Sequence, residues 1–256
     1  MLTSIDLNSD MGEREDAEGM ALDAELMPFI TSINIACGGH AGSPSLMRRT
    51  AQRAAAHGLA IGAHPSFRDR EQFGRIPQHL VPHDIESLVT EQIDTLANVL
   101  KQERLTLTHV KPHGALYNMA ARDPAVAQAI VQAVQRLNRG LLLYALAGSV
   151  LVRVAQAAGL PVVQEAFADR AYRADGTLVP RSEAGAVLTN EEAVSRQLRG
   201  IIAGTATSID GLGVPVQADS LCLHSDTPHT VGLARIVRRE LETAGIRIAA
   251  AGPHHA

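Results

Sequence analysis

Leu107-Thr108-His109-Val110-Lys111-Pro112-His113 is a short apolar run that ends in a histidine, and similar runs end at His40, His64 and His224. Short apolar runs bounded by turn residues are typical of buried strands. Parallel strands place their carboxyl ends on one face of a sheet or barrel, where α/β folds carry their chemistry. The recurrence therefore predicts that histidines far apart in the sequence meet at one site.

Strand-like runs alternate with runs of helical period along the chain, which predicts parallel βα units. The expected strands are 4–8, 32–37, 59–63, 106–110, 141–147, 161–165, 220–223 and 246–249. Helix starts are predicted where a capping side chain precedes a proline, at Ser43, Asp123 and Thr227. Thr189 and Glu192 have the spacing of a capping box. The helices should pack outside the strands.

The composition fits one large aliphatic core. The chain has 256 residues, 46% of them hydrophobic, with four Phe, three Tyr and no Trp. Such a core suits a parallel sheet or barrel, and barrels of this length form one unit, so we expect a single (β/α) barrel domain over residues 1–256. The two cysteines lie in apolar runs, as expected for buried thiols in a reducing compartment.

Charge and hydropathy exclude several classes of partner. The formal net charge is -4 and there is no long basic run, which argues against nucleic acid. The sequence shows neither a secretory signal pattern nor an apolar stretch long enough for a membrane span. We therefore expect a cytoplasmic protein that works on a small molecule. Whether copies of the chain form a homo-oligomer stays open.

The first expected strand leads into a turn rich in polar groups, Asp6-Leu7-Asn8-Ser9-Asp10-Met11-Gly12-Glu13. Carboxylates held close together bind a metal or raise one another's pKa for acid-base work. Asp10 is the leading catalytic candidate, and Asn8 and Glu13 are candidate contacts for a substrate. The competing interpretation is an ordinary polar turn.

Two further groups of residues can carry chemistry. His40 and His64 have small neighbours that let a ligand or ion approach, so His40 is a candidate substrate contact and His64 a candidate catalytic residue. With Asp10 they also form a candidate metal site, although no local metal motif is present. Lys111 is one of only two lysines among 23 basic residues. Together with His113 it offers a cation and a titratable base, able to polarise a carbonyl and move a proton.

Another expected strand ends at Glu165, a candidate catalytic acid, and is followed by Asp169 and Arg170. Arg181 lies in the long polar loop over 167–189, and loops of that length are usually functional. Arginine binds carboxylates and phosphates bidentately, so this region can hold an anionic substrate, with His224 completing the site. A solvated surface network explains the same charges equally well.

Common nucleotide and nucleophile motifs are missing from the sequence. It contains no Gly-x-x-x-x-Gly-Lys-Ser/Thr stretch, no Gly-x-Gly-x-x-Gly after a strand and no Gly-x-Ser-x-Gly elbow. A bound nucleotide would therefore need an irregular site.

Several of these blocks together resemble the LamB/YcsF family. They are DLNSDMGE (6–13), NIACGGHAG (34–42), GAHPS (62–66), VKPHGALYN (110–118), EAFADR (165–170), LVPR (178–181) and VQADSLCLHSDTP (216–228). Two positions depart from the family pattern, because Ser9 stands where a cysteine is usual and Gly39 where a bulky aromatic is usual. The second departure can widen the pocket beside His40.

The resemblance implies an irregular TIM-like (β/α) barrel of about seven parallel strands, similar to glycoside hydrolase and deacetylase barrels. It also implies ring opening of 5-oxo-L-proline to L-glutamate with ATP hydrolysis, alongside 5-oxoprolinase subunits B and C. Two alternatives remain. A metal-dependent amide or ester hydrolase would use Asp10, His40 and His64 as ligands for a divalent metal, and a non-catalytic subunit would only support assembly.

Overall fold

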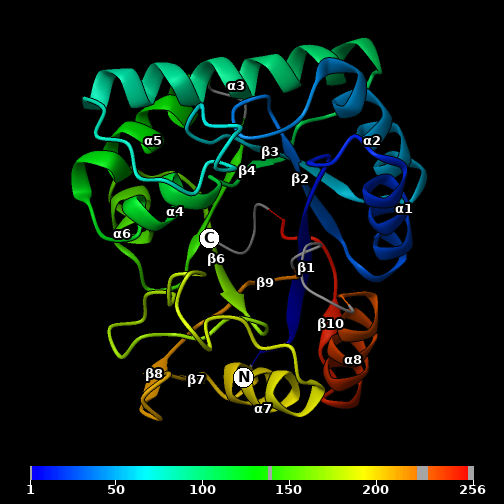
Figure 1. Ribbon diagram of the computed structural model, residues 1–256, viewed down its shortest axis with the longest axis vertical. Coiled ribbons are helices and arrows are strands. Elements are labelled where there is room, and N and C mark those ends of the chain that lie inside the picture. The colour runs from blue at the N-terminus through cyan, green and yellow to red at the C-terminus, as the bar shows by residue number, and fades with distance from the viewer. Residues whose placement is uncertain (1, 138–139, 224–229, 253–256) are drawn as a thin grey trace.

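Seven parallel strands close into a barrel in the computed structural model, which describes residues 2–137, 140–223 and 230–252 (Figure 1). The strands are β1 (Ser4–Met11), β2 (Ser32–Ala36), β3 (Ala60–His64), β4 (His109–Val110), β5 (Leu142–Leu146), β6 (Val162–Phe167) and β9 (Ser220–Cys222). β1 pairs with β2 on one side and β9 on the other, and β9 also pairs with β6, which closes the ring. The expected barrel of parallel strands is confirmed.

An eighth parallel strand, β10 (Arg247–Ile248), extends the sheet beside the first residues of β1. All of the expected strands are found, with ends shifted by up to three residues in either direction. Like β10, β4 has only two residues, because only His109 and Val110 of the run over 106–110 pair with their neighbours.

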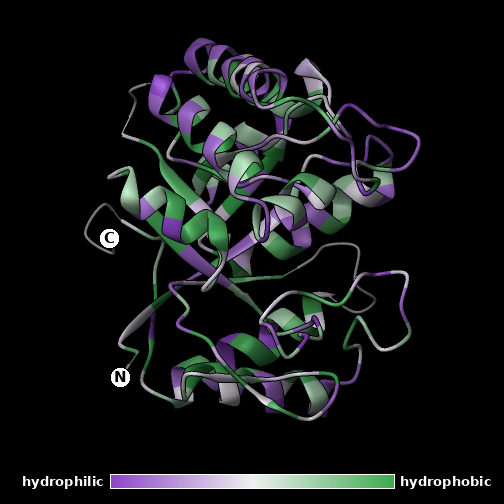
Figure 2. Ribbon diagram, turned by 90° about the vertical axis from the view of Figure 1, so that its left-hand side faces the viewer, coloured by the Kyte–Doolittle hydropathy of each residue, from purple (hydrophilic) through white to green (hydrophobic). Residues whose placement is uncertain are grey.

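Helices surround the barrel, and Figure 2 shows hydrophobic and hydrophilic residues alternating along them. They are α1 (Ala17–Leu26), α2 (Pro44–Ala56), α3 (Pro82–Gln102), α4 (Gly114–Ala120), α5 (Pro124–Arg136), α6 (Val150–Ala157), α7 (Glu191–Ile202) and α8 (Thr230–Thr243), with a short 3₁₀ turn η1 (Met27–Phe29) after α1. Among the described residues, no helix is long and apolar enough to cross a lipid bilayer.

Two of the predicted helix starts are confirmed. The Ser43 hydroxyl and the Asp123 carboxylate accept hydrogen bonds from the first amides of α2 and α5, whereas Thr227 lies outside the described residues. The capping box expected at Thr189 is wrong, because Asn190 caps α7 by accepting from the amides of Glu192 and Ala193.

Three elements gave no clear sequence signal. The buried residues of α1 include a glycine and an aspartate, so this helix has no continuous apolar stripe. Helix α4 has only seven residues, and the antiparallel hairpin of β7 (Thr205–Thr207) and β8 (Gly213–Pro215) has only three residues in each strand. Periodicity cannot be read over such lengths.

The interior of the barrel is polar. From β1, the side chains of Asp6, Asn8 and Asp10 hydrogen-bond inside the barrel to side chains of the neighbouring strands β2 and β9, while Leu7 and Met11 join the main hydrophobic core. Gly62 makes room for this interior, since a Cβ at that position would come within 2.1 Å of His109 Nε2. The aliphatic residues predicted as a core therefore pack largely between the strands and the helices.

Candidate functional site

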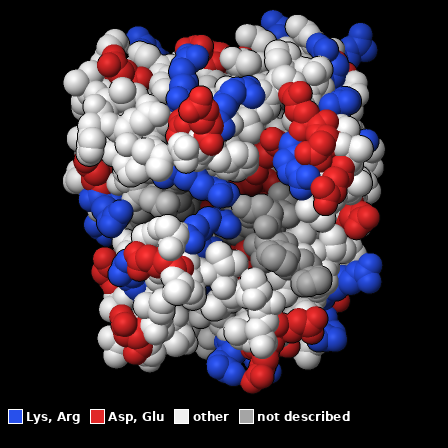
Figure 3. All heavy atoms as spheres, viewed as in Figure 1, with Lys and Arg blue, Asp and Glu red and all other residues white. Residues whose placement is uncertain are grey.

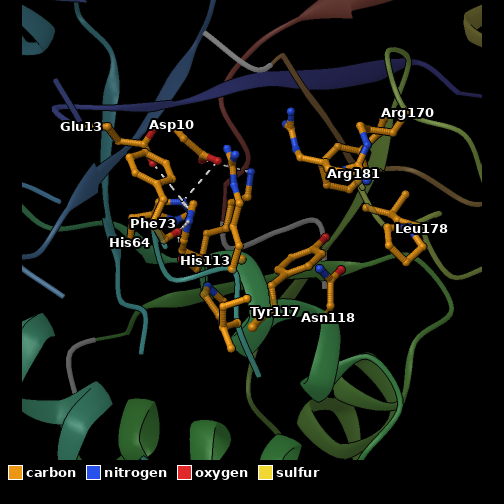
Figure 4. Close-up of a pocket in the computed structure, with 18 of the residues that line it drawn as sticks. Asp10, Glu13, His64, Phe73, His113, Tyr117, Asn118, Arg170, Leu178 and Arg181 are labelled. Atoms are coloured by element: carbon orange, nitrogen blue, oxygen red, sulfur yellow. Dashed lines mark hydrogen bonds and ion pairs between the residues drawn. The ribbon is translucent and has the colours of Figure 1, made fainter. Parts of the chain in front are cut away.

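A cavity of about 450 Å³ opens at the carboxyl ends of the strands. Its wall includes Asp10, Glu13, His64, Phe73, Arg75, Lys111, His113, Tyr117, Asn118, Phe167, Arg170, Leu178 and Arg181. Acidic and imidazole groups gather on one side of it, and Arg170 and Arg181 lie on the other (Figure 4). The structure thus brings together residues that are distant in sequence, whereas His224 lies outside the described residues.

The histidines form one cluster with Glu13. The rings of His40 and His113 stack with centroids 3.7 Å apart, and His64 meets His113 edge to face at 4.8 Å. His113 Nδ1 lies 2.9 Å from His64 Nε2, and His40 Nε2 lies 2.9 Å from Glu13 Oε1. His40 is buried behind the pocket wall, although it was expected to contact a substrate.

A group of potential metal ligands stands out among the residues that the structure describes. One side-chain atom from each of Glu13, His40, His64 and His113 lies within 4.8 Å of the others. The sequence had suggested Asp10, His40 and His64 instead. Asp10 remains close, with Oδ2 3.2 Å from His64 Nε2, but its Oδ1 accepts from Asn34 and pairs with Lys111.

Burial controls the protonation of this cluster. The pKa values of His40 and His113 are held well below the ordinary histidine value, chiefly by desolvation on burial, to which the neighbouring imidazoles of the cluster add. At neutral pH both rings are therefore neutral and can act as bases or ligands.

Lys111 is a fixed, buried cation. Its Nζ lies 2.7 Å from Glu165 Oε1 and 3.2 Å from Asp10 Oδ1, and it also donates to Asn8 Oδ1 and Cys222 Sγ. Burial alone would lower the pKa of Lys111, but the negative charges of Asp10 and Glu165 raise it well above its ordinary value. The ammonium can therefore polarise a carbonyl oxygen in the pocket.

Three expected site residues lie behind the wall. Asn8 and Glu165 are 0% exposed and contact Lys111, and Glu165 Oε2 accepts a hydrogen bond from the Tyr117 hydroxyl at 2.7 Å. Asp169 is also buried and is absent from the wall. Their burial keeps them from lining the cavity, where Glu165 had been expected to act in catalysis and Asn8 and Asp169 to contact a substrate.

The opposite side of the cavity is basic. Figure 3 shows Lys and Arg side chains beside a hollow in the middle of this face. Arg170 is buried, and its guanidinium donates to the carbonyls of Ala186 and Val179. Arg75 and Arg181 also line the cavity. Arg181 is partly exposed, and its side chain reaches the pocket from a long loop, as expected.

Sequence reasoning missed Phe73, Arg75 and Tyr117 as wall residues. Phe73 has a backbone φ of 55°, which is rare for a bulky residue, and its carbonyl lies 2.9 Å from His113 Nε2. No local sequence pattern predicts such a conformation.

Known proteins of one family are similar to this chain over nearly its whole length. A model described as the LamB/YcsF family matches residues 5–255. The A subunit of 5-oxoprolinase from Symbiobacterium thermophilum is 49% identical over 249 residues, which covers 97% of this chain and 95% of the relative. The A subunit of 5-oxoprolinase from Bordetella pertussis is 48% identical over 252 residues, covering 98% and 100%.

A solved structure agrees with these relatives. The crystal structure of the lactam utilization protein from Thermus thermophilus matches with a TM-score of 0.88 at 44% identity, covering 97% of this chain and 100% of that one.

Proposed function

Since this chain belongs to the LamB/YcsF family, we propose that it is the A subunit of an ATP-dependent 5-oxoprolinase. The reaction opens the ring of 5-oxo-L-proline to give L-glutamate and is coupled to ATP hydrolysis, with the B and C subunits as partners. The observation that carries the proposal is the pocket itself, where Lys111 and the Asp10, His64 and His113 side chains face a basic wall.

The substrate sets three chemical demands. A five-membered lactam is an unactivated amide that carries a carboxylate, so the site must anchor an anion, polarise a carbonyl and supply a base for water. Arg170 and Arg181 are our candidates for the anchor, since both line the cavity. Lys111 polarises the carbonyl oxygen.

The base comes from the acidic and imidazole side of the pocket. Asp10 and His113 both line the cavity, and His64 lies between them, 3.2 Å from Asp10 and 2.9 Å from His113. A proton taken from water by either group can pass to His64 over these short distances. Glu165 and Asn8 act through Lys111 by holding its ammonium in place.

ATP makes the amide reactive. Transfer of the γ-phosphoryl group of ATP to the lactam oxygen, with release of ADP, turns a poor electrophile into an imidate-like one. Attack by water then breaks the C–N bond, with the ring nitrogen leaving as the amine, and gives an acyl phosphate. A second water hydrolyses the acyl phosphate to glutamate and phosphate. The sequence has no phosphate-binding loop of common form, so we assign part of the nucleotide chemistry to the partner subunits. This chain alone should show little ATP-coupled turnover.

Reconstitution tests the proposal. This chain alone, and this chain mixed with the B and C subunits, are assayed for glutamate formation from 5-oxoproline and ATP. Activity should appear only in the full mixture and be lost with a combined Asp10→Asn and His113→Asn variant, with assembly checked by gel filtration. The matched control is His83→Asn, which changes an exposed histidine in α3. Full turnover by the combined variant would leave only an assembly role for this chain.

A second candidate is hydrolysis of an amide or ester assisted by a divalent metal without ATP. It is favoured by the four potential ligands within 4.8 Å of one another. Hydrolysis of the lactam by the isolated chain, independent of nucleotide and abolished by a chelator, would favour this candidate over the first.

A further inference from the structure

We propose that Glu13, His40, His64 and His113 form a binding site for one divalent first-row transition-metal ion, of which Zn²⁺ fits best. The site would lie in the wall of the pocket, beside Lys111. This inference goes beyond the lactam reaction, because it concerns the protein without substrate.

The hydrogen bonds of His64 and His113 carry the proposal. His64 Nδ1 lies 2.7 Å from the carbonyl oxygen of Lys111, and His113 Nε2 lies 2.9 Å from that of Phe73. A carbonyl only accepts, so each of these nitrogens carries the ring proton. In the neutral rings, the opposite nitrogens, His64 Nε2 and His113 Nδ1, therefore both present lone pairs across 2.9 Å. Two acceptors at that distance repel unless a cation or an extra proton joins them.

His40 and Glu13 repeat the arrangement. His40 Nδ1 lies 2.9 Å from the Ser66 hydroxyl, whose oxygen is also 3.0 Å from the Phe67 carbonyl. When Ser66 gives its one proton to that carbonyl, His40 Nδ1 donates to Ser66, and His40 Nε2 turns a lone pair toward Glu13 Oε1. In each ring, the nitrogen that points away from the cluster donates a hydrogen bond to an oxygen. Proteins orient metal-bound histidines in the same way.

The distances suit a tetrahedral ion. Bonds of about 2.0–2.1 Å to zinc imply ligand separations of roughly 3.4 Å. Three of the six ligand separations bracket this value, at 2.9 Å for His64 with His113, 2.9 Å for His40 with Glu13 and 3.7 Å for His113 with Glu13, and all six are within 4.8 Å. Small shifts of the side chains would centre an ion among them.

The ligand types and charges narrow the choice of ion. Imidazole nitrogens with one carboxylate favour zinc and its first-row neighbours over Mg²⁺ and Ca²⁺, which prefer oxygen. Asp10 lies 3.2 Å from His64 Nε2, so two carboxylates flank the cluster, and the nearby ammonium of Lys111 is already shared with Glu165. A divalent ion would balance this charge and act as a Lewis acid toward a bound carbonyl.

Metal content and metal binding test the proposal without any activity assay. Chain without an affinity tag, carrying His254→Ala and His255→Ala to remove the terminal histidine pair, is stripped with a chelator and titrated calorimetrically with Zn²⁺. We expect one ion per chain. Co²⁺ in its place should give the visible absorption of a tetrahedral nitrogen and oxygen site.

Variants locate the ion. His113→Asn and Glu13→Gln should each weaken Zn²⁺ binding by about 100-fold or more, since even outer-shell changes cost about 10–100-fold. His83→Ala, at an exposed position in α3, should leave affinity unchanged. Circular dichroism and thermal melting show which variants fold, and either ligand variant alone suffices for the test.

Two results would overturn the proposal. Failure of the stripped chain to bind Zn²⁺, Co²⁺ or Mn²⁺ would mean that a proton shared by His64 Nε2 and His113 Nδ1 resolves their conflict. Binding that survives both His113→Asn and Glu13→Gln would place the ion elsewhere. Neither result depends on whether 5-oxoproline is the substrate.

Discussion

Two polar clusters are buried in the same barrel, one around Asp6 at the amino end of β1 and one around His64 and His113 at the carboxyl ends of the strands. Asp6 accepts hydrogen bonds from hydroxyl groups on four side chains, those of Thr31, Ser32, Tyr144 and Ser220. In the histidine cluster, the tautomers proposed above turn acceptor atoms toward acceptor atoms across 2.9 Å.

The two clusters are alike in burial and differ in hydrogen-bond satisfaction. Burial raises the pKa of Asp6, although its hydroxyl partners oppose that shift. A buried polar group with all its partners stabilises one structure, whereas a group of opposed acceptors is stable only when something else is bound. The Asp6 cluster and the histidine cluster therefore differ in how completely their hydrogen bonds are satisfied, more than in how deeply they are buried.

The largest expected effect comes from changing equivalent carboxylates in the two clusters. Asp10→Asn should lower reconstituted turnover by about 10²–10⁴-fold, as expected for loss of acid-base function, with a smaller change in stability. Asp6→Asn should lower the free energy of unfolding by about 1–3 kcal/mol and leave turnover per folded molecule unchanged. Urea unfolding and steady-state assays of both variants check this. A matching loss of turnover in Asp6→Asn would break the comparison.

Removal of the buried ammonium comes next. Lys111→Met leaves Glu165 and Asp10 without their shared cation, which should lower the free energy of unfolding by about 3–5 kcal/mol. Lys101, the other lysine, is exposed in the last turn of α3, and Lys101→Met should change it by no more than about 0.5 kcal/mol. Urea unfolding compares the two variants, and equal effects would mean that Lys111 contributes no specific pairing.

The pH dependence of stability tests the link between the clusters. His109 Nε2 donates to Asn34, whose amide donates to Asn8 and Asp10. Burial, followed by the charge of Lys111, lowers the pKa of His109 from 6.5 to about 3. Between pH 6.5 and about 3, His109 is therefore protonated in the unfolded chain but stays neutral in the folded chain. This contribution to stability is complete above pH 6.5 and falls as pH drops toward 3.

We expect a loss of about 1.4 kcal/mol per pH unit from this group within that window. His109→Gln keeps a donor near Asn34 and removes the titration, so its stability should fall less steeply between pH 6.5 and 5. Parallel curves for the two proteins in urea unfolding would show that His109 does not titrate as the geometry requires.

The smallest expected effect sharpens the comparison within the Asp6 cluster. Ser32→Ala removes one of the hydroxyl donors to Asp6 and leaves those of Thr31, Tyr144 and Ser220. The free energy of unfolding should fall by about 0.5–1.5 kcal/mol, with turnover unchanged. A loss above that range in thermal melting would mean that the remaining hydroxyls cannot compensate.

The strands and most site residues could be predicted because strand-ending histidines and a rare lysine stand out in the sequence. The sequence could not show that His40, Asn8 and Glu165 lie behind the wall, because depth in a barrel depends on how strands pair. Phe73 and Tyr117 were missed for a related reason, since a strained backbone and a seven-residue helix place them. The donor and acceptor roles in a hydrogen bond follow only from the positions of the atoms. The sequence therefore could not predict the opposed lone pairs proposed for His64 and His113.

The closure of the barrel has a consequence for biosynthesis. β1, at the start of the chain, pairs with β9 through Asp6 with Ser220 and Asn8 with Cys222. A ribosome must therefore make most of the chain before this edge of β1 finds its partner, and contacts so distant in sequence form slowly. Exposed edge strands are aggregation hazards that charged side chains suppress. The polar inward face of β1 would thus keep the nascent chain soluble until β9 has been synthesised and can pair with β1.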